Sequence, residues 1–122
     1  MAVLMVFLGG ILGAPLRYLI DKAVQSRHDS VFPWGTFLIN VSGAFVLGAV
    51  TGAGHAHGLP GDAVLLLGTG VCGALTTFST FTFETVRLLE EGSLAEAGLN
   101  VVGSLAVGLP AAAAGYALLT WL

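Results

Sequence analysis

Residues 73–81 read Gly-Ala-Leu-Thr-Thr-Phe-Ser-Thr-Phe and lie within an apolar segment that is long enough to cross a membrane. Four of these nine side chains carry hydroxyls, although hydroxyl groups gain nothing from contact with lipid tails. Gly68, Gly70 and Gly73 weaken the helix at the same depth. Non-helical backbone is tolerated there only where protein buries it or where it lines a polar path. The stretch therefore predicts a broken helix at a permeation pathway or a binding site.

The whole chain has the composition of an integral membrane protein. Of its 122 residues, 56% are hydrophobic and 9% are charged, and the mean hydropathy is +0.93. A soluble domain carries about 25% charged residues, so the charged helix faces of a soluble bundle are missing. The apolar blocks predict a single all-α membrane domain, residues 1–122. Its four expected spans, each near the ~20 residues that a spanning helix needs, are residues 3–23, 33–54, 63–89 and 94–122.

Three basic residues lie at one end of the expected bundle. The connections after the first and third spans hold Lys22, Arg27 and Arg87, whereas the N-terminus, the turn at 55–62 and the C-terminus hold no Lys or Arg. The positive-inside rule would place the first end in the cytoplasm. Three charges form a weak bias, so insertion in both orientations stays open.

Pairs of small residues predict close helix packing and an oligomer. Gly9 and Gly13 form one small-xxx-small pair in the first span, and Gly48 and Gly52 form another in the second. Four helices of this size cannot enclose much of a lumen, so a homo-oligomer is expected, and the glycine pairs offer surfaces for it.

The titratable residues argue against catalysis and against a metal cluster. Ser79 has no His or Lys partner at membrane depth, because His28, His55 and His57 fall in connections, so no enzyme activity and no catalytic residue are expected. The single cysteine, Cys72, excludes an internal disulfide and has no metal-ligand spacing around it. A net charge of −3 is too small to imply a nucleic-acid partner.

Passive permeation of a small ion fits the remaining residues better than a pump does. A proton-coupled pump normally needs an embedded carboxylate, and Glu84, the one candidate, lies off the centre of its span. The alternative is a small four-helix coupled exporter of drugs or organic cations. Such an exporter needs a carboxylate deep in the first helix, where this chain has Arg17.

The polar groups favour an anion. Asn40 shares a helix face with Thr36, and its N–H groups donate, as hydroxyls also can. Phe78 and Phe81 are three residues apart, so both rings project from nearly the same face, and a ring edge is positive. Arg17 would attract the same charge. Hydroxyls also accept from a cation, so the composition leaves a cation open.

Three stretches resemble the signature sequences of the Fluc (CrcB) family of fluoride ion channels, and the length and the four spans agree from end to end. The stretches are Gly-Gly-Ile-Leu-Gly-Ala-Pro-Leu-Arg-Tyr at 9–18, Gly-Thr-Phe-Leu-Ile-Asn-Val-Ser-Gly at 35–43, and Gly-Val-Cys-Gly-Ala-Leu-Thr-Thr-Phe-Ser-Thr-Phe at 70–81. The resemblance implies an antiparallel dimer in the cell membrane, with two pores between its subunits that export toxic fluoride passively.

The resemblance also implies roles for individual residues. Ring edges of two phenylalanines would face fluoride, an asparagine would donate to it, and hydroxyls would continue a polar track. These pore residues are Asn40, Phe78, Phe81, Ser79, Thr80 and Ser104. Arg17 would be the arginine of the vestibule, and the carbonyls of Gly73 and Thr76 would hold a structural Na⁺ at the dimer interface.

Two positions depart from the family pattern. Ala74 stands where many relatives have a second glycine, which carbonyl ligation does not require. Gly108 supplies no hydroxyl where some relatives have a second serine, so the fourth span would contribute one hydroxyl to the track. The asymmetry of the basic residues leaves open a heterodimer with a paralogous chain in place of a homodimer.

Overall fold

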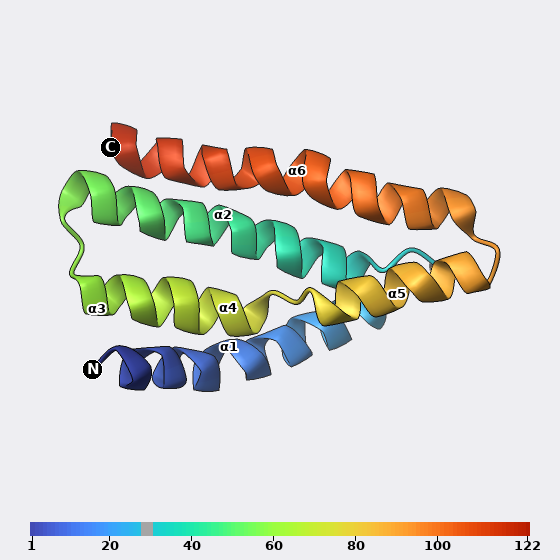
Figure 1. Cartoon of the computed structure of the whole chain (residues 1–122), viewed down its shortest axis with the longest axis horizontal. Helices are drawn as coiled ribbons and strands as arrows, with labels where there is room; N and C mark the ends of the chain where they lie inside the picture. The colour runs from blue at the N-terminus through green and yellow to red at the C-terminus, as the bar shows by residue number, and fades with distance from the viewer. Residues whose placement is uncertain (28–30) are drawn as a thin grey trace.

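The computed structural model describes residues 1–27 and 31–122, and His28, expected in a connection, lies outside the described residues. Every regular element in the described ranges is helical (Figure 1). The first, second and fourth spans are α1 (Ala2–Gln25), α2 (Trp34–His57) and α6 (Leu94–Trp121). The third extends over Gly61–Glu90, so the described residues contain the four expected membrane-spanning helices.

The third span is built from four short elements. It begins as α3 (Gly61–Val64), widens into the π-helix η1 (Leu65–Cys72) and closes as α4 (Gly73–Leu75). Thr76 is extended, with φ −77° and ψ 159°, and α5 (Ser79–Glu90) then resumes the span. The predicted break is confirmed. The second half-helix begins at Ser79.

The break lets the two halves of the third span pack against different neighbours. The first half, η1 and α4, lies against α1, whereas α5 leaves α1 and lies against α6. In Figure 1, α2 lies between α6 and the third span. The pivot at Thr76 therefore places α5 beside α2 and α6.

Left-handed glycines end two of the helices. Gly58 follows α2 with φ +64°, and Gly92 follows α5 with φ +81°. A residue with a Cβ is strained in this conformation, which is why glycine so often terminates a helix. After α5, the N–H of Ser93 donates to the carbonyl of Leu88 at 2.8 Å, and the chain turns directly into α6.

The glycine pairs pack helices within the subunit, which corrects the expectation that they supply surfaces for an oligomer. A Cβ at Gly9 would meet the backbone of Gly70 at 2.6 Å. A Cβ at Gly52 would meet the backbone of Tyr116 at 2.6 Å, and a Cβ at Gly48 would press on the backbone of Ala112. Small residues allow this approach, and the pairs in α1 and α2 are used for η1 and α6 respectively.

Large apolar side chains cover the outer surface of the bundle. Only 11% of the apolar window of α1 and 6% of that of α6 are buried within the subunit. Water cannot solvate such a surface without a large free-energy cost, whereas lipid tails or a second protein surface can cover it. The protein is a multi-pass membrane protein.

Candidate functional site

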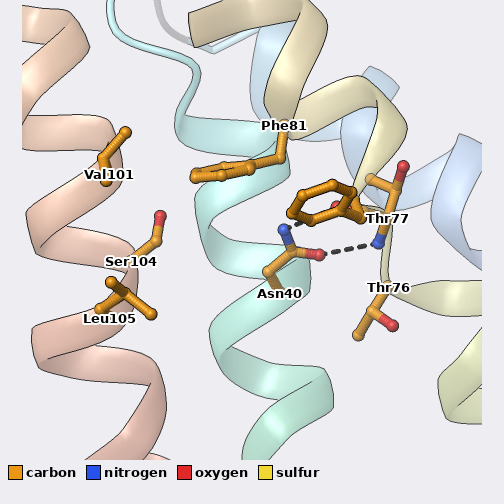
Figure 2. Close-up of a pocket in the computed structure, with 8 residues that line it drawn as sticks. Asn40, Thr76, Thr77, Phe81, Val101, Ser104 and Leu105 are labelled. Atoms are coloured by element: carbon orange, nitrogen blue, oxygen red, sulfur yellow. Dashed lines mark hydrogen bonds between the residues drawn. The ribbon is translucent and has the colours of Figure 1, made fainter.

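The break in the third span is held by the side chain of Asn40. Its Nδ2 donates to the carbonyl of Thr77 at 3.0 Å, and its Oδ1 accepts from the N–H of the same residue at 2.9 Å (Figure 2). The amide thus pairs with both backbone groups of one peptide residue. In the membrane these groups have no water to bond, so this clamp satisfies the backbone that the break exposes.

The clamp also changes the bonding of the first half-helix. In a continuous helix the N–H of Thr77 would donate to the carbonyl of Gly73, but it donates to Asn40 instead. Gly73 is exposed, and a Cβ at this position would meet nothing within 4 Å. The carbonyl of Gly73 is therefore released from helical bonding on an open face of the subunit.

A threonine hydroxyl caps the second half-helix, although the residue directly before that helix is Phe78. The N–H of Thr80 donates to Oγ1 of Thr77 at 3.1 Å. The first N–H groups of a helix have no intrahelical partner, and a hydroxyl three residues earlier serves one of them. Thr77 is thus bonded from both sides of the break.

An open pocket of about 430 Å³ lies beside the break. Asn40 from α2, Phe81 from α5 and Ser104 from α6 project toward one space in Figure 2. The ring centroids of Phe78 and Phe81 are 6.1 Å apart. The full lining consists of Asn40, Thr76, Thr77, Phe78, Phe81, Val101, Ser104 and Leu105.

The polar groups of this pocket are mainly donors or can act as donors. Asn40 uses one of its two Nδ2 hydrogens on Thr77, so the second remains for a ligand. Oγ of Ser104 is buried and has no hydrogen-bond partner in the described structure. Ring edges of phenylalanine add positive potential without a competing lone pair. The pocket suits a small anion that gives up its water.

Arg17 lies on the other side of the break in a smaller, polar pocket of about 200 Å³. Thr36, Thr77 and Thr80 share that lining, and Nη1 of Arg17 lies 3.5 Å from the carbonyl of Thr76. The expected arginine thus meets the break itself. Asp21 also lines this pocket, and its buried Oδ1 has no partner among the described residues.

Glu84, whose role the sequence did not assign, lies on the buried face of α5 with only 8% of its surface exposed. The hydroxyl of Thr36 donates to its Oε1 at 2.5 Å. The spacing in α2 predicts that Thr36 and Asn40 share a helix face, and both side chains bond to residues of the third span. The pairing of Thr36 with Glu84 depends on how α5 lies against α2 and has no sequence signal.

The expected pore residues divide between the two pockets. Asn40, Phe78, Phe81 and Ser104 meet in the first pocket, and Thr80 lines the second. Ser79 is exposed and lines neither pocket. Thr77 lies between the pockets and lines both, so it joins them through the break.

Comparison with known proteins gives a consistent result. Residues 4–116 match the family described as CrcB-like protein, Camphor Resistance (CrcB). The protein named Fluoride-specific ion channel FluC 1 of Streptomyces avermitilis is 57% identical over 112 residues, which are 92% of this chain and 90% of that protein. FluC 1 of Frankia casuarinae is 52% identical over 94% of this chain and 93% of its own length. FluC 2 of Haloarcula marismortui is 50% identical over 83% of this chain and 79% of its own length. The chain therefore belongs to the CrcB (Fluc) family, as its three signature stretches predicted.

Proposed function

We propose that this protein is a fluoride-selective ion channel that passively exports F⁻ and so lowers the toxicity of fluoride in the cytoplasm. The observation that carries the proposal is the pocket beside the break in the third span, where Asn40, Phe81 and Ser104 converge. The names of the relatives, at up to 57% identity, support the same ion. The coupled-exporter alternative is not favoured, since Arg17 occupies the position where it needs a carboxylate.

Permeation follows from the order of the groups along the two pockets. Arg17 raises the local concentration of anions at one mouth. Thr80 and Thr77 offer hydroxyl donors toward the break, and Asn40, Phe78 and Phe81 then replace water around the ion. Ser104 takes over on the far side. Ser79 is exposed, so we assign it to the track only where a second subunit covers that surface.

We further propose that two subunits form an antiparallel dimer with two pores in the cell membrane. The pocket at Asn40 is open on one side, and Phe78 beside it is 78% exposed, an unusual position for a ring that serves a pore. A second subunit would cover this side. A homodimer is the simpler arrangement, and a heterodimer with a paralogous chain is the alternative.

A structural Na⁺ at the dimer interface would be held by backbone carbonyls of Gly73 and Thr76. The released, exposed carbonyl of Gly73 fits a hard cation, which prefers oxygen ligands. The carbonyl of Thr76 is shared with Arg17 through a long 3.5 Å contact, which a bound cation would displace. When bound, Na⁺ supplies a fixed positive charge between the subunits. Replacing Na⁺ by N-methylglucamine should lower the thermal stability of the dimer, and equal stability would contradict this assignment.

The test of the proposed function is ion efflux from liposomes that contain the purified protein. A fluoride electrode should record F⁻ efflux above that of empty liposomes, whereas a chloride electrode should record none. No enzymatic turnover is part of the proposal. Fluoride efflux equal to that of empty liposomes would refute it, and a proton gradient that drives accumulation of a drug would support the exporter instead.

A further inference from the structure

Asn100 of α6 is completely buried and is linked to the pore ring through one intermediate residue. Its exposed fraction is 0%, and its Nδ2 donates to Oγ1 of Thr85 at 2.8 Å. That hydroxyl donates in turn to the carbonyl of Phe81 at 2.8 Å. The chain of bonds therefore runs from α6 to the backbone of the residue whose ring lines the pocket.

This chain of bonds ties α5 to α6. After the break, α5 has left α1 and packs against α6. Among the side-chain hydrogen bonds of the described residues, the bond from Asn100 to Thr85 is the one that joins these two helices. Apolar contacts leave a helix free to slide or rotate by small amounts, whereas a directional bond fixes its register. The height and rotation of Phe81 thus depend on this bond.

The amide of Asn100 is a poor choice for stability alone. Its Oδ1 is buried and has no partner in the described structure. An unsatisfied buried acceptor costs free energy that a leucine of similar size would not. If this side chain only filled space between α5 and α6, leucine would give a more stable protein. The amide therefore serves the bond that it makes to Thr85.

We propose that Asn100 is a positioning residue for the pore ring Phe81, acting through the hydroxyl of Thr85. This inference rests on the proposed fluoride channel. Asn100 does not touch the permeating ion in this arrangement. It sets the register of α5 against α6, and this register sets the distance between the ring of Phe81 and the amide of Asn40 across the pocket.

The experiment measures fluoride efflux and dimer melting for the wild type and five variants. Asn100→Leu removes the amide, Thr85→Val removes the hydroxyl, and the double variant removes both. Thr85→Ser keeps the hydroxyl. The matched control is Thr51→Val, because the hydroxyl of Thr51 makes the same bond to the carbonyl four residues earlier, at 2.8 Å, on an exposed face of α2.

The proposal expects Asn100→Leu and Thr85→Val each to lower fluoride efflux about fivefold, as the loss of one hydrogen bond does. The double variant should be no slower than the slower single variant, because both remove the same link. Thr85→Ser and Thr51→Val should conduct like the wild type. Asn100→Leu should melt at or above the wild-type temperature, which separates positioning from a purely structural role.

Wild-type efflux in both Asn100→Leu and Thr85→Val would overturn the inference, as would a Thr85→Ser variant that is as slow as Thr85→Val. If Asn100→Leu does not assemble, the comparison of Thr85→Val with Thr85→Ser decides by itself. Absence of fluoride efflux from the wild type would refute the proposed function and this inference with it. If the wild type conducts and the variants conduct equally well, the result counts against the role of Asn100 alone.

Discussion

At the scale of single residues, Asn40 serves two purposes with one amide. It binds both backbone groups of Thr77 and still has one N–H for a ligand in the pocket. An anion donor is usually pictured as a free side chain. Here the clamp fixes the donor, because an amide held by two bonds cannot rotate away, and a fixed donor stabilises an ion without first being reoriented.

Replacing Asn40 by Asp should lower fluoride efflux roughly tenfold or more while dimers persist. An ionised Asp still accepts from the N–H of Thr77, but it has no hydrogen to donate to the carbonyl. Leaving that buried acceptor unpaired costs about 1–3 kcal/mol, and the new negative charge repels the anion. Liposome efflux measures the effect.

The matched control for this variant is Ser42→Ala. Ser42 lies two residues after Asn40, and its hydroxyl donates to the carbonyl of Ile39 within the same helix at 3.2 Å. The Ser42→Ala channel should conduct fluoride like the wild type. Equal efflux from Asn40→Asp and Ser42→Ala would show that neither the clamp nor the donor matters.

Replacing Phe81 by Ile should also lower fluoride efflux sharply, because an aliphatic side chain has no positive ring edge. Phe83→Ile is the control on the same half-helix, since Phe83 is 66% exposed and lines neither pocket. Gel filtration should find dimers for both variants. A Phe81→Ile channel that conducts as fast as Phe83→Ile would contradict the pore assignment.

At the scale of elements, the third span works as two helices with different neighbours. Its first half follows α1 through a π-helical segment, and its second half follows α6. A π-helix is rare and is found mostly at functional sites. Here it lies just before the break, where Gly70 passes close to the backbone of Gly9. The close approach of η1 to α1 and the turn at Thr76 together move α5 toward α6.

Glycines let α2 and α6 approach each other closely. Gly48→Ala should destabilise the protein by about 1–3 kcal/mol, since its Cβ would press on the backbone around Ala112, which cannot yield as a side chain does. Gly98→Ala in α6 is the control. A Cβ there meets nothing within 4 Å, so this change should be neutral or stabilise by about 0.5–1 kcal/mol.

Thermal unfolding in detergent, followed by circular dichroism, measures both glycine variants. A melting temperature for Gly48→Ala at or above that of Gly98→Ala would show that the two helices can separate without cost, and the tight backbone contact would then have no energetic meaning.

At the scale of the whole molecule, the ends of the bundle differ in charge and its sides are apolar. Both termini lie at one end together with the connection from α2 to α3 (Figure 1). Arg27 and Arg87 belong to the opposite end. Because only a few cations distinguish the two ends, the positive-inside rule acts weakly on this chain.

An antiparallel homodimer requires that the chain insert in both orientations. In a Cys72→Ser background, Ala56→Cys places a thiol on an exposed residue at the end of α2. A membrane-impermeant maleimide should label roughly half of the protein in sealed cells or vesicles, given so weak a charge bias. Labelling of all molecules, or of none, would indicate one fixed orientation and would favour a heterodimer with a paralogous chain.

The sequence predicted most of the site because its signals are local. Hydroxyls and glycines at membrane depth predicted the break, and the spacing of Phe78 and Phe81 predicted rings on one face. The bonds of Thr77 to Asn40 and of Glu84 to Thr36 were not predicted, because each joins residues more than thirty positions apart. The bond between Asn100 and Thr85 was not predicted either, because it joins two different helices.

The sequence by itself determined four apolar spans, an interruption in the third, and the kinds of polar groups near that interruption. These follow from the solvent, since a lipid environment admits backbone irregularity and hydroxyls only where something covers them. Only the tertiary structure decided that the glycine pairs serve contacts within the subunit and that α5 changes neighbours at the break. It also decided that Asn40 bonds the backbone of Thr77. Those outcomes depend on which helices approach closely enough to exclude a side chain, and this approach is a property of the packed bundle.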